Sequence, residues 1–173
     1  MKTWKDSVDF HGHECVGLTI GYKASVLAAQ LLELEFSQDE QVVCIAENDA
    51  CGVDAIQVML GCSLGKGNLL FHMRGKSAYS FYSRKTGKSV RLVMKAGPQG
   101  MTKEESFAYY QAIDPREMFD VKDTTIRLPE KARLFDSYTC ECCGETAGAN
   151  WIRLAGGKKL CLDCYENYDR FHV

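Results

Sequence analysis

Three short strands in succession are predicted by residues 69–94, which read LLFHMRGKSAYSFYSRKTGKSVRLVM. Apolar, aromatic and β-branched residues, which favour strands, recur in three segments, 69–73, 77–84 and 89–94. The segments between them, Arg74-Gly-Lys76 and Lys85-Thr-Gly-Lys88, contain the glycines that tight turns between neighbouring antiparallel strands use. The stretch therefore predicts a β-meander.

The residues before this meander predict a helix, a strand and a second helix. Residues 17–33 carry small and apolar side chains at helical spacing, and Gly17 and Gly21 share a face that would let another backbone approach closely. The β-branched residues 41–47 predict a strand, and residues 54–60 predict a short helix that ends at Gly61.

After the meander the chain returns to helix. Thr102 can cap a helix that runs to about residue 113, with Glu105 completing a capping box, and Asp114-Pro115 can start another short helix. Residues 121–128 alternate like a further strand. Helices and strands thus come in blocks, which predicts an α+β fold with helices packed on a largely antiparallel sheet.

Composition sets the class of the molecule. The 173 residues are 46% apolar and 25% charged with a net charge of −2, which predicts a soluble domain of ordinary size plus a small appendage. The mild acidity gives no general attraction to nucleic acid or to anionic membranes. No apolar run of membrane-spanning length exists, and the N-terminus lacks the apolar core of a signal peptide. We therefore expect a cytoplasmic protein without a membrane partner.

Cysteine is over-represented, with nine in the chain, five of them after residue 139. In a reducing compartment such cysteines favour metal ligands or reactive thiols over disulfides. Near Asp136, glycines, cysteines and short polar stretches replace the apolar runs. We therefore expect two domains, an α+β domain with a His/Cys cavity over residues 1–135 and a zinc ribbon over residues 136–173.

The C-terminal motif is a pair of C-x2-C hairpins separated by 17 residues, formed by Cys140, Cys143, Cys161 and Cys164. Two such hairpins complete a tetrahedral four-sulfur site for zinc, and the metal would supply much of the folding free energy of so small a module. An iron–sulfur or redox thiol site with the same ligands is the alternative. Cys142 is the odd member and could replace a neighbouring cysteine as a ligand, but Cys143 fits the spacing better.

Whether the ribbon binds nucleic acid is left open by its charges. Arg153, Lys158 and Lys159 surround the gap, and Trp151 and Tyr165 could stack on bases. Acidic residues of similar number lie among them, so contact with a protein is at least as well supported.

A second candidate metal site lies at the start of the first predicted helix, where His11, His13 and Cys15 alternate with other residues. In an extended segment, residues two apart point the same way, so the three could face one cavity. The helix N-terminus would favour thiolate at Cys15, and imidazole with thiolate suits zinc, iron, nickel or copper. The alternative is a His pair that only satisfies backbone groups near a helix cap.

The segment after the predicted strand at 41–47 adds further candidates. Cys51 falls at a helix start, which would lower its pKa, and Asp54 and Gln57 follow at one-turn intervals on the same face. Cys62 would lie about 16 Å from Cys51 along a helix, too far to share a metal in one subunit. Cys44, in the strand, is better explained as a small buried side chain.

Residues 61–68, GCSLGKGN, look at first like a phosphate loop but do not form one. The glycine spacing is too short, the hydroxyl residue that holds magnesium is missing, and the loop leads into a strand. The loop could still bring Lys66 and Asn68 to a cleft, with Lys66 contacting an anion. The alternative is a plain helix-to-strand connection with no ligand.

These motifs together resemble the FmdE family, which takes its name from a component of molybdenum formylmethanofuran dehydrogenase. The resemblance covers about residues 5–130 and rests on Phe10-His-Gly-His-x-Cys15, on Asp-Ala-Cys-x-x-Asp-Ala-Ile-Gln57 and on Gly-Cys-Ser-x-Gly-Lys-Gly-Asn68. It implies an α+β domain with a metal-binding cavity near the first motif, often dimeric. A four-cysteine ribbon also occurs in members of the family.

Two functions are therefore expected. The first is a metal-dependent enzyme or redox accessory that acts on a small carbonyl or one-carbon substrate, with zinc in the ribbon and zinc or another transition metal in the N-terminal cavity. The second is a non-catalytic carrier, adaptor or regulator that docks a partner enzyme or nucleic acid through the ribbon. The expected catalytic residues are Cys15, Cys51, Asp54 and Lys66. The expected metal ligands are Cys140, Cys143, Cys161, Cys164, His11, His13, Cys15 and Cys51.

Overall fold

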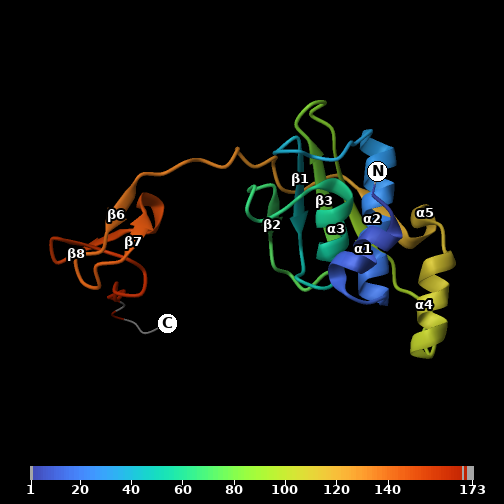
Figure 1. The fold of residues 1–173 in the computed structure, drawn as a ribbon. Coiled ribbons are helices and arrows are strands. Elements are labelled where there is room, and N and C mark those ends of the chain that lie inside the picture. The colour runs from blue at the N-terminus through green and yellow to red at the C-terminus, as the bar shows by residue number, and fades with distance from the viewer. Residues whose placement is uncertain (1, 169, 171–173) are drawn as a thin grey trace. The chain divides into compact units, whose positions relative to one another are not determined.

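The computed structural model describes residues 2–168 and residue 170, and the chain divides into two compact units, Met1–Ala132 and Arg133–Val173 (Figure 1). Within the described residues, the first unit holds one five-stranded sheet and five helices, and the second holds two short hairpins. The α+β fold class is confirmed. That the units are separate domains, with a boundary between residues 135 and 136, stays a prediction.

The sheet of the first unit has the strand order β2-β1-β3-β4-β5. All neighbouring pairs are antiparallel except β1 and β2, which run parallel, so the sheet is largely antiparallel as expected. The strands are β1 (Val42–Ala46), β2 (Leu69–Phe71), β3 (Ala78–Ser83), β4 (Ser89–Met94) and β5 (Phe119–Lys122).

The predicted meander is wrong in its first strand. Residues 69–71 pair with β1 rather than with β3, and the meander proper is β3-β4-β5. The cause lies at Asn68, whose carbonyl accepts from the Cys44 amide while its side-chain amide donates to the Val42 and Gly61 carbonyls. These bonds fix the start of β2 beside β1, and the helix between the two strands makes the pair parallel.

Five helices accompany the sheet: α1 (Trp4–His11), α2 (Val16–Leu32), α3 (Gly52–Leu60), α4 (Lys103–Ala112) and α5 (Pro115–Met118). The capping box at Thr102 and Glu105 is confirmed, as is the stop of α3 at Gly61. Helix α1 was not expected from the sequence, although it begins with a second capping box between Thr3 and Asp6. His11 therefore sits in the last turn of a helix and not in an extended segment.

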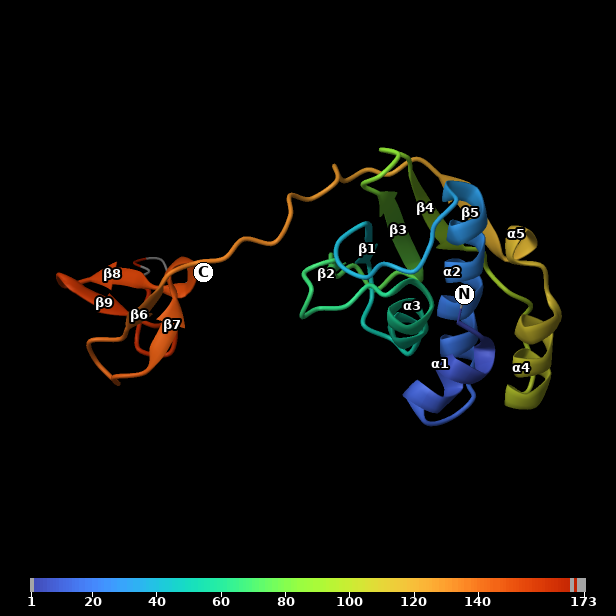
Figure 2. The same cartoon turned by 45° about the horizontal axis from the view of Figure 1, so that its top comes forward.

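The helices cover one face of the sheet, and α2 lies between the sheet and the pair α4 and α5 (Figure 2). The main core forms between this helical layer and the sheet. The opposite face carries a smaller cluster around Val43, Ile45 and Tyr82, against which Ile126 packs. The strand predicted to reach residue 128 ends at Lys122, because the chain then crosses this face, where the Tyr82 hydroxyl donates to the Ile126 carbonyl at 2.7 Å.

The two helices nearest the candidate site cross backbone to backbone. A Cβ on Gly21 of α2 would lie 1.9 Å from the Gly52 carbonyl oxygen of α3, and one on Gly52 would lie 2.7 Å from the Tyr79 hydroxyl. The close approach expected of the glycine face of residues 17–33 is thus observed. It places the beginnings of α2 and α3 side by side.

The second unit pairs β6 (Ser137–Thr139) with β7 (Thr146–Gly148) and β8 (Arg153–Ala155) with β9 (Lys158–Leu160). A single 3-10 turn, η1 (Ala149–Trp151), links the two hairpins. Across both units, the described helices include none with the length and apolar character to cross a lipid bilayer.

Candidate metal centres

The N-terminal cluster forms where α1 ends and α2 begins. His11 lies in the last turn of α1, Gly12 ends that helix with φ at +92°, and Cys15 caps α2 by accepting the Leu18 amide at 3.3 Å. One donor atom from each of His11, His13 and Cys15 lies within 4.8 Å of the other two. The three side chains therefore come together at the turn between α1 and α2. They were expected to do so from an extended segment.

Asp54 fixes the orientation of the His11 ring. Its Oδ2 lies 2.7 Å from His11 Nδ1, and its Oδ1 accepts the Gln57 side-chain amide at 3.2 Å. With Nδ1 engaged by a carboxylate, His11 Nε2 is the nitrogen that faces Cys15 Sγ, at 3.8 Å. A carboxylate on the outer nitrogen of a metal-binding histidine fixes its tautomer and raises its basicity. Asp54 thus reaches the cluster through His11.

Cys51 enters the site from α3, across the glycine face of α2. A Cβ on Gly17 would lie 3.1 Å from the Cys51 Cβ, 3.5 Å from Cys51 Sγ and 3.9 Å from Cys15 Sγ, so this glycine of α2 lies directly against both cysteines. Cys51 stands outside the three-residue cluster of His11, His13 and Cys15. Burial and the neighbouring Cys15 thiol raise its pKa, which contradicts the lowered pKa expected from its place at a helix start.

A cavity of about 380 Å³ opens on this site. Its lining includes His11 of the cluster, with Cys51, Asp54 and Gln57, and the apolar side chains of Leu64, Leu69 and Phe71. Three donor atoms on one side of a metal leave coordination positions free for a small ligand. The arrangement therefore suits a metal with an accessible position next to a thiol.

Lys66 and Asn68 do not reach this cavity. Lys66 donates to the Ser37 carbonyl at 2.8 Å and lines a separate, adjacent pocket, with which the His/Cys cavity shares Gln57. Asn68 is fully buried, and its side chain makes hydrogen bonds with four backbone groups, the Ser63 amide and the Asp39, Val42 and Gly61 carbonyls, so its role is structural. The prediction that both side chains line a cleft is wrong for Asn68.

The two remaining cysteines of the first unit lie in the core. Cys44 and Cys62 are both fully buried, and the Cys62 thiol contacts the Val42 carbonyl oxygen. Burial raises the pKa of Cys62 to about 12 and that of Cys44 well above its ordinary value. Both therefore behave as small apolar side chains, as expected for Cys44.

A buried ion pair at the end of β1 was missed from the sequence. Arg91 donates to the Glu47 carboxylate through Nε at 2.6 Å and through a terminal nitrogen at 2.9 Å, and these bonds hold the pKa of Glu47 below its ordinary value. The only sequence signal was a lone arginine between Val90 and Leu92 in a predicted strand. The pair joins β1 to β4 across β3, beside the loop that carries Cys51.

In the second unit, the four predicted cysteines meet. Donor atoms of Cys140, Cys143, Cys161 and Cys164 all lie within 4.8 Å of one another, and the Cys143 and Cys161 sulfurs are 3.8 Å apart. Zinc–sulfur bonds of about 2.3 Å in a tetrahedron require sulfurs about 3.8 Å apart. The cluster therefore has the spacing of a four-thiolate metal site.

Backbone amides prepare this cluster for anionic sulfur. The amides of Cys143, Cys161 and Cys142 lower the pKa of Cys140 to about 6. Hydrogen bonds with the Cys143 and Cys161 side chains, by contrast, raise the pKa of Cys164, because they favour its protonated form. Cys142 is exposed and stands outside the four-sulfur cluster, to which it contributes only its backbone amide. A bound cation would favour the deprotonated form of all four sulfurs.

Comparison with known proteins gives three consistent similarities. Residues 10–128 match the family model described as "FmdE, Molybdenum formylmethanofuran dehydrogenase operon". A probable S-adenosyl-L-methionine-binding protein of Archaeoglobus fulgidus is 30% identical over 92% of this chain and 51% of its own length. The chain thus spans about half the length of that relative.

A solved structure shares both the fold and much of the length. It is a crystal structure of a tungsten formylmethanofuran dehydrogenase FmdE-like protein from Syntrophus aciditrophicus, with a TM-score of 0.69 and 26% identity. The match covers 92% of this chain and 88% of that one. The likeness therefore includes the C-terminal unit as well as the sheet and helices.

Proposed function

Since this chain belongs to the FmdE family, we propose that it is a metal-binding protein with one metal in each unit. In the first unit, His11, His13 and Cys15 hold a transition metal ion, zinc or another, and Cys51 stands beside it as a further ligand or thiol. In the second unit, zinc binds to Cys140, Cys143, Cys161 and Cys164. The clustering of the His11, His13 and Cys15 donor atoms, with Asp54 on the far nitrogen of His11, carries the proposal.

The first site supports a reaction on a small carbonyl or one-carbon substrate. When bound, the ion supplies Lewis acidity or redox chemistry at an open position. Asp54 and Gln57 orient His11 through the hydrogen bonds between them. The apolar side chains of Leu64, Leu69 and Phe71 line the same cavity and offer contact to the carbon atoms of a bound substrate. Cys51 is the one thiol of this cavity placed to attack it or to complete the ligand set.

Metal analysis of purified variants tests this proposal. Wild-type protein is expected to hold two metal ions per chain. Cys15→Ser should lose the first and Cys143→Ser the second, whereas Cys142→Ser, which changes an exposed cysteine outside the cluster, should keep both. Wild-type stoichiometry in Cys15→Ser would contradict the first site, and wild-type stoichiometry in Cys143→Ser would contradict the second.

An accessory role is the second candidate, and the surface of the second unit favours it. Trp151, Leu154 and Tyr168 are exposed there, although the ribbon needs none of them as ligands. The family description names a dehydrogenase operon, which supports a partner enzyme. Co-purification of a dehydrogenase component with the wild-type protein, and its loss in Trp151→Ala with the metal retained, would establish this role. Retention of that component by Trp151→Ala would remove the ribbon from it.

Assembly and location form the last part of the proposal. The family resemblance implies a homodimer, which light scattering during size-exclusion chromatography tests directly. We place the protein in the cytoplasm, because all nine cysteines are free and thiolate ligands need a reducing compartment.

A further inference from the structure

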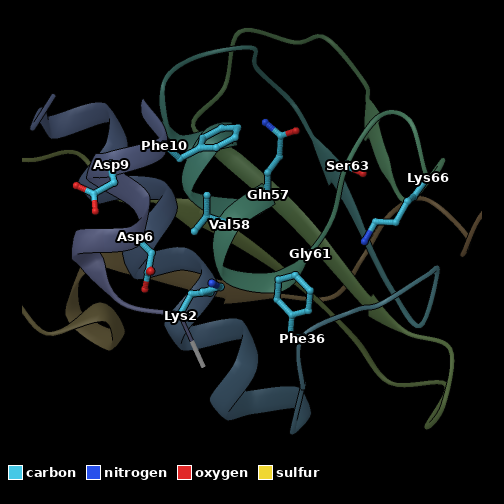
Figure 3. Close-up of a pocket in the computed structure, with 10 residues that line it drawn as sticks. All are labelled: Lys2, Asp6, Asp9, Phe10, Phe36, Gln57, Val58, Gly61, Ser63 and Lys66. Atoms are coloured by element: carbon cyan, nitrogen blue, oxygen red, sulfur yellow. The ribbon is translucent and has the colours of Figure 1, made fainter. Parts of the chain in front are cut away.

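A second pocket of about 470 Å³ lies next to the His/Cys cavity (Figure 3). It is bounded by Asp6, Asp9 and Phe10 of α1, by the last turns of α3, and by Phe36 and Lys66 from two loops. Volumes of about 300–1,000 Å³ are typical of small-molecule sites. Gln57 lines this pocket as well as the His/Cys cavity, and its side chain holds Asp54. The pocket therefore adjoins the proposed metal site through one residue.

The apolar part of the pocket is built from two aromatic rings. Phe10 and Phe36 lie on opposite sides of Val58 and are 58% and 41% exposed, respectively (Figure 3). The Phe36 ring lies so close to Gly61 that a Cβ there would be 2.9 Å from its Cζ. The ring thus rests against backbone at a fixed place. Two exposed rings facing one hollow offer stacking surface to a flat ligand.

Charged side chains of both signs line the pocket, namely Asp6, Asp9, Lys2 and Lys66. Asp9 pairs with Lys5 at 2.7 Å, and Asp6 accepts the Thr3 amide and hydroxyl at 2.6 and 2.7 Å. Both carboxylates are therefore engaged within α1 and its cap.

Lys66 is placed differently. Its ammonium group points into the pocket (Figure 3), donates one hydrogen bond to the Ser37 carbonyl and lies 5.8 Å from the centre of the Phe36 ring. The ion pairs found among the described residues do not include Lys66. An ammonium group has three donors, so two remain for a ligand. The cation is held in position and its charge is not neutralised by a carboxylate.

We propose that this pocket binds a small aromatic anion, with its carboxylate or phosphate on Lys66 and its ring between Phe10 and Phe36. That this ligand is the one on which the neighbouring His/Cys site acts rests on the proposed function. Binding itself depends only on the pocket. Gln57 lies between the two cavities, so a ligand seated here reaches toward Asp54 and His11 without displacing a metal ligand.

Calorimetric titration of the full chain with three probes tests the proposal. The probes are 2-naphthoate, its uncharged analogue 2-naphthalenemethanol, and adenosine 5'-monophosphate as the phosphate form. Wild-type protein should bind 2-naphthoate or the monophosphate more tightly than the alcohol. A charge-assisted hydrogen bond corresponds to about a tenfold or greater change in affinity. Lys66→Met should therefore lower the affinity for both anions by at least that factor. Lys95→Met, at an exposed lysine outside the pocket, should not.

Further variants separate charge, ring and fold. Lys66→Arg keeps the charge, so its affinity for the anions should stay within about threefold of that of wild type. Phe36→Leu should lower the affinity for all three probes. Affinity for the anions within twofold of wild type in folded Lys66→Met would overturn the proposal, as would equal binding of 2-naphthoate and the alcohol by wild type. Should Lys66→Met fail to fold, the salt dependence of wild type tests the role of charge. The affinity for the anions should fall with rising salt, and an affinity that does not change with salt would overturn the proposal. Metal retention by Cys15→Ser would overturn only the proposed function.

Discussion

Replacing Gly21 by alanine tests whether the crossing of α2 and α3 builds the His/Cys site. The added Cβ would lie 1.9 Å from the Gly52 carbonyl oxygen, whereas ordinary contact begins at 3.4 Å, so the helices must separate by 3.4 − 1.9 = 1.5 Å at this point. Both contacting groups are fixed to backbone, and neither can rotate away. Overpacking of this kind costs about 1–3 kcal/mol, and the rigid contact places Gly21→Ala near about 3 kcal/mol. Gly52 is bonded to Cys51, so the separation also moves this thiol away from Cys15.

Urea denaturation followed by circular dichroism measures the first effect, and metal content of the purified variant measures the second. We expect a free energy of unfolding lower by about 3 kcal/mol and less than one equivalent of metal in the first unit. Gly65→Ala is the matched control, because no heavy atom lies within 4 Å of its added Cβ and its φ lies outside the left-handed region. Equal stability and equal metal content in the two variants would refute the packing argument.

Three further outcomes follow from contacts elsewhere in the chain. Lys23 donates to the Gln111 and Ile113 carbonyls at the end of α4, at 2.8 and 2.7 Å, so Lys23→Met should lower the free energy of unfolding by about 2 kcal/mol in urea denaturation. Arg91 lowers the pKa of Glu47, so ionised Glu47 stabilises the fold fully above its unfolded pKa, and this stabilisation fades as the pH falls toward its folded pKa. Wild type should therefore lose more stability than Glu47→Gln between about pH 6 and pH 3 in the same assay. In a Trp4→Phe background, a strong chelator should shift the fluorescence of the remaining tryptophan in the ribbon and leave the helical circular dichroism signal of the first unit unchanged.

Local patterns predicted most of the elements. The run 17–33, the glycine stop at residue 61 and the capping box at Thr102 each depend on neighbouring residues, and each is found within a residue or two of its expected place. The four-cysteine cluster could also be predicted from the sequence, since each C-x2-C hairpin directs two sulfurs to one point. What depends on spacing along the chain could thus be predicted from the sequence.

The errors arise where a distant contact overrides a local pattern. The glycines around residue 75 suggested a hairpin, but the bonds of buried Asn68 direct the preceding strand to β1. Cys51 does begin a helix, yet burial and the Cys15 thiol raise its pKa, against the direction that the helix start alone predicts. Lys66 follows the right motif but points to the neighbouring pocket, because the Ser37 carbonyl holds it there.

The two proposed metal centres differ in how they depend on folding. The ribbon takes all four ligands from one small unit, so its metal and its fold form together. In the first unit, the cluster residues are neighbours in the sequence, but Asp54 and Cys51 arrive from α3 only when α2 and α3 cross at Gly21 and Gly52. The orientation of His11, and with it the affinity of the site for a metal, therefore depends on the packing of α2 against α3. A mutation where α2 and α3 cross should weaken metal binding at the first site and leave it unchanged at the second. Such a result would distinguish a change in the core from a change in the ligands.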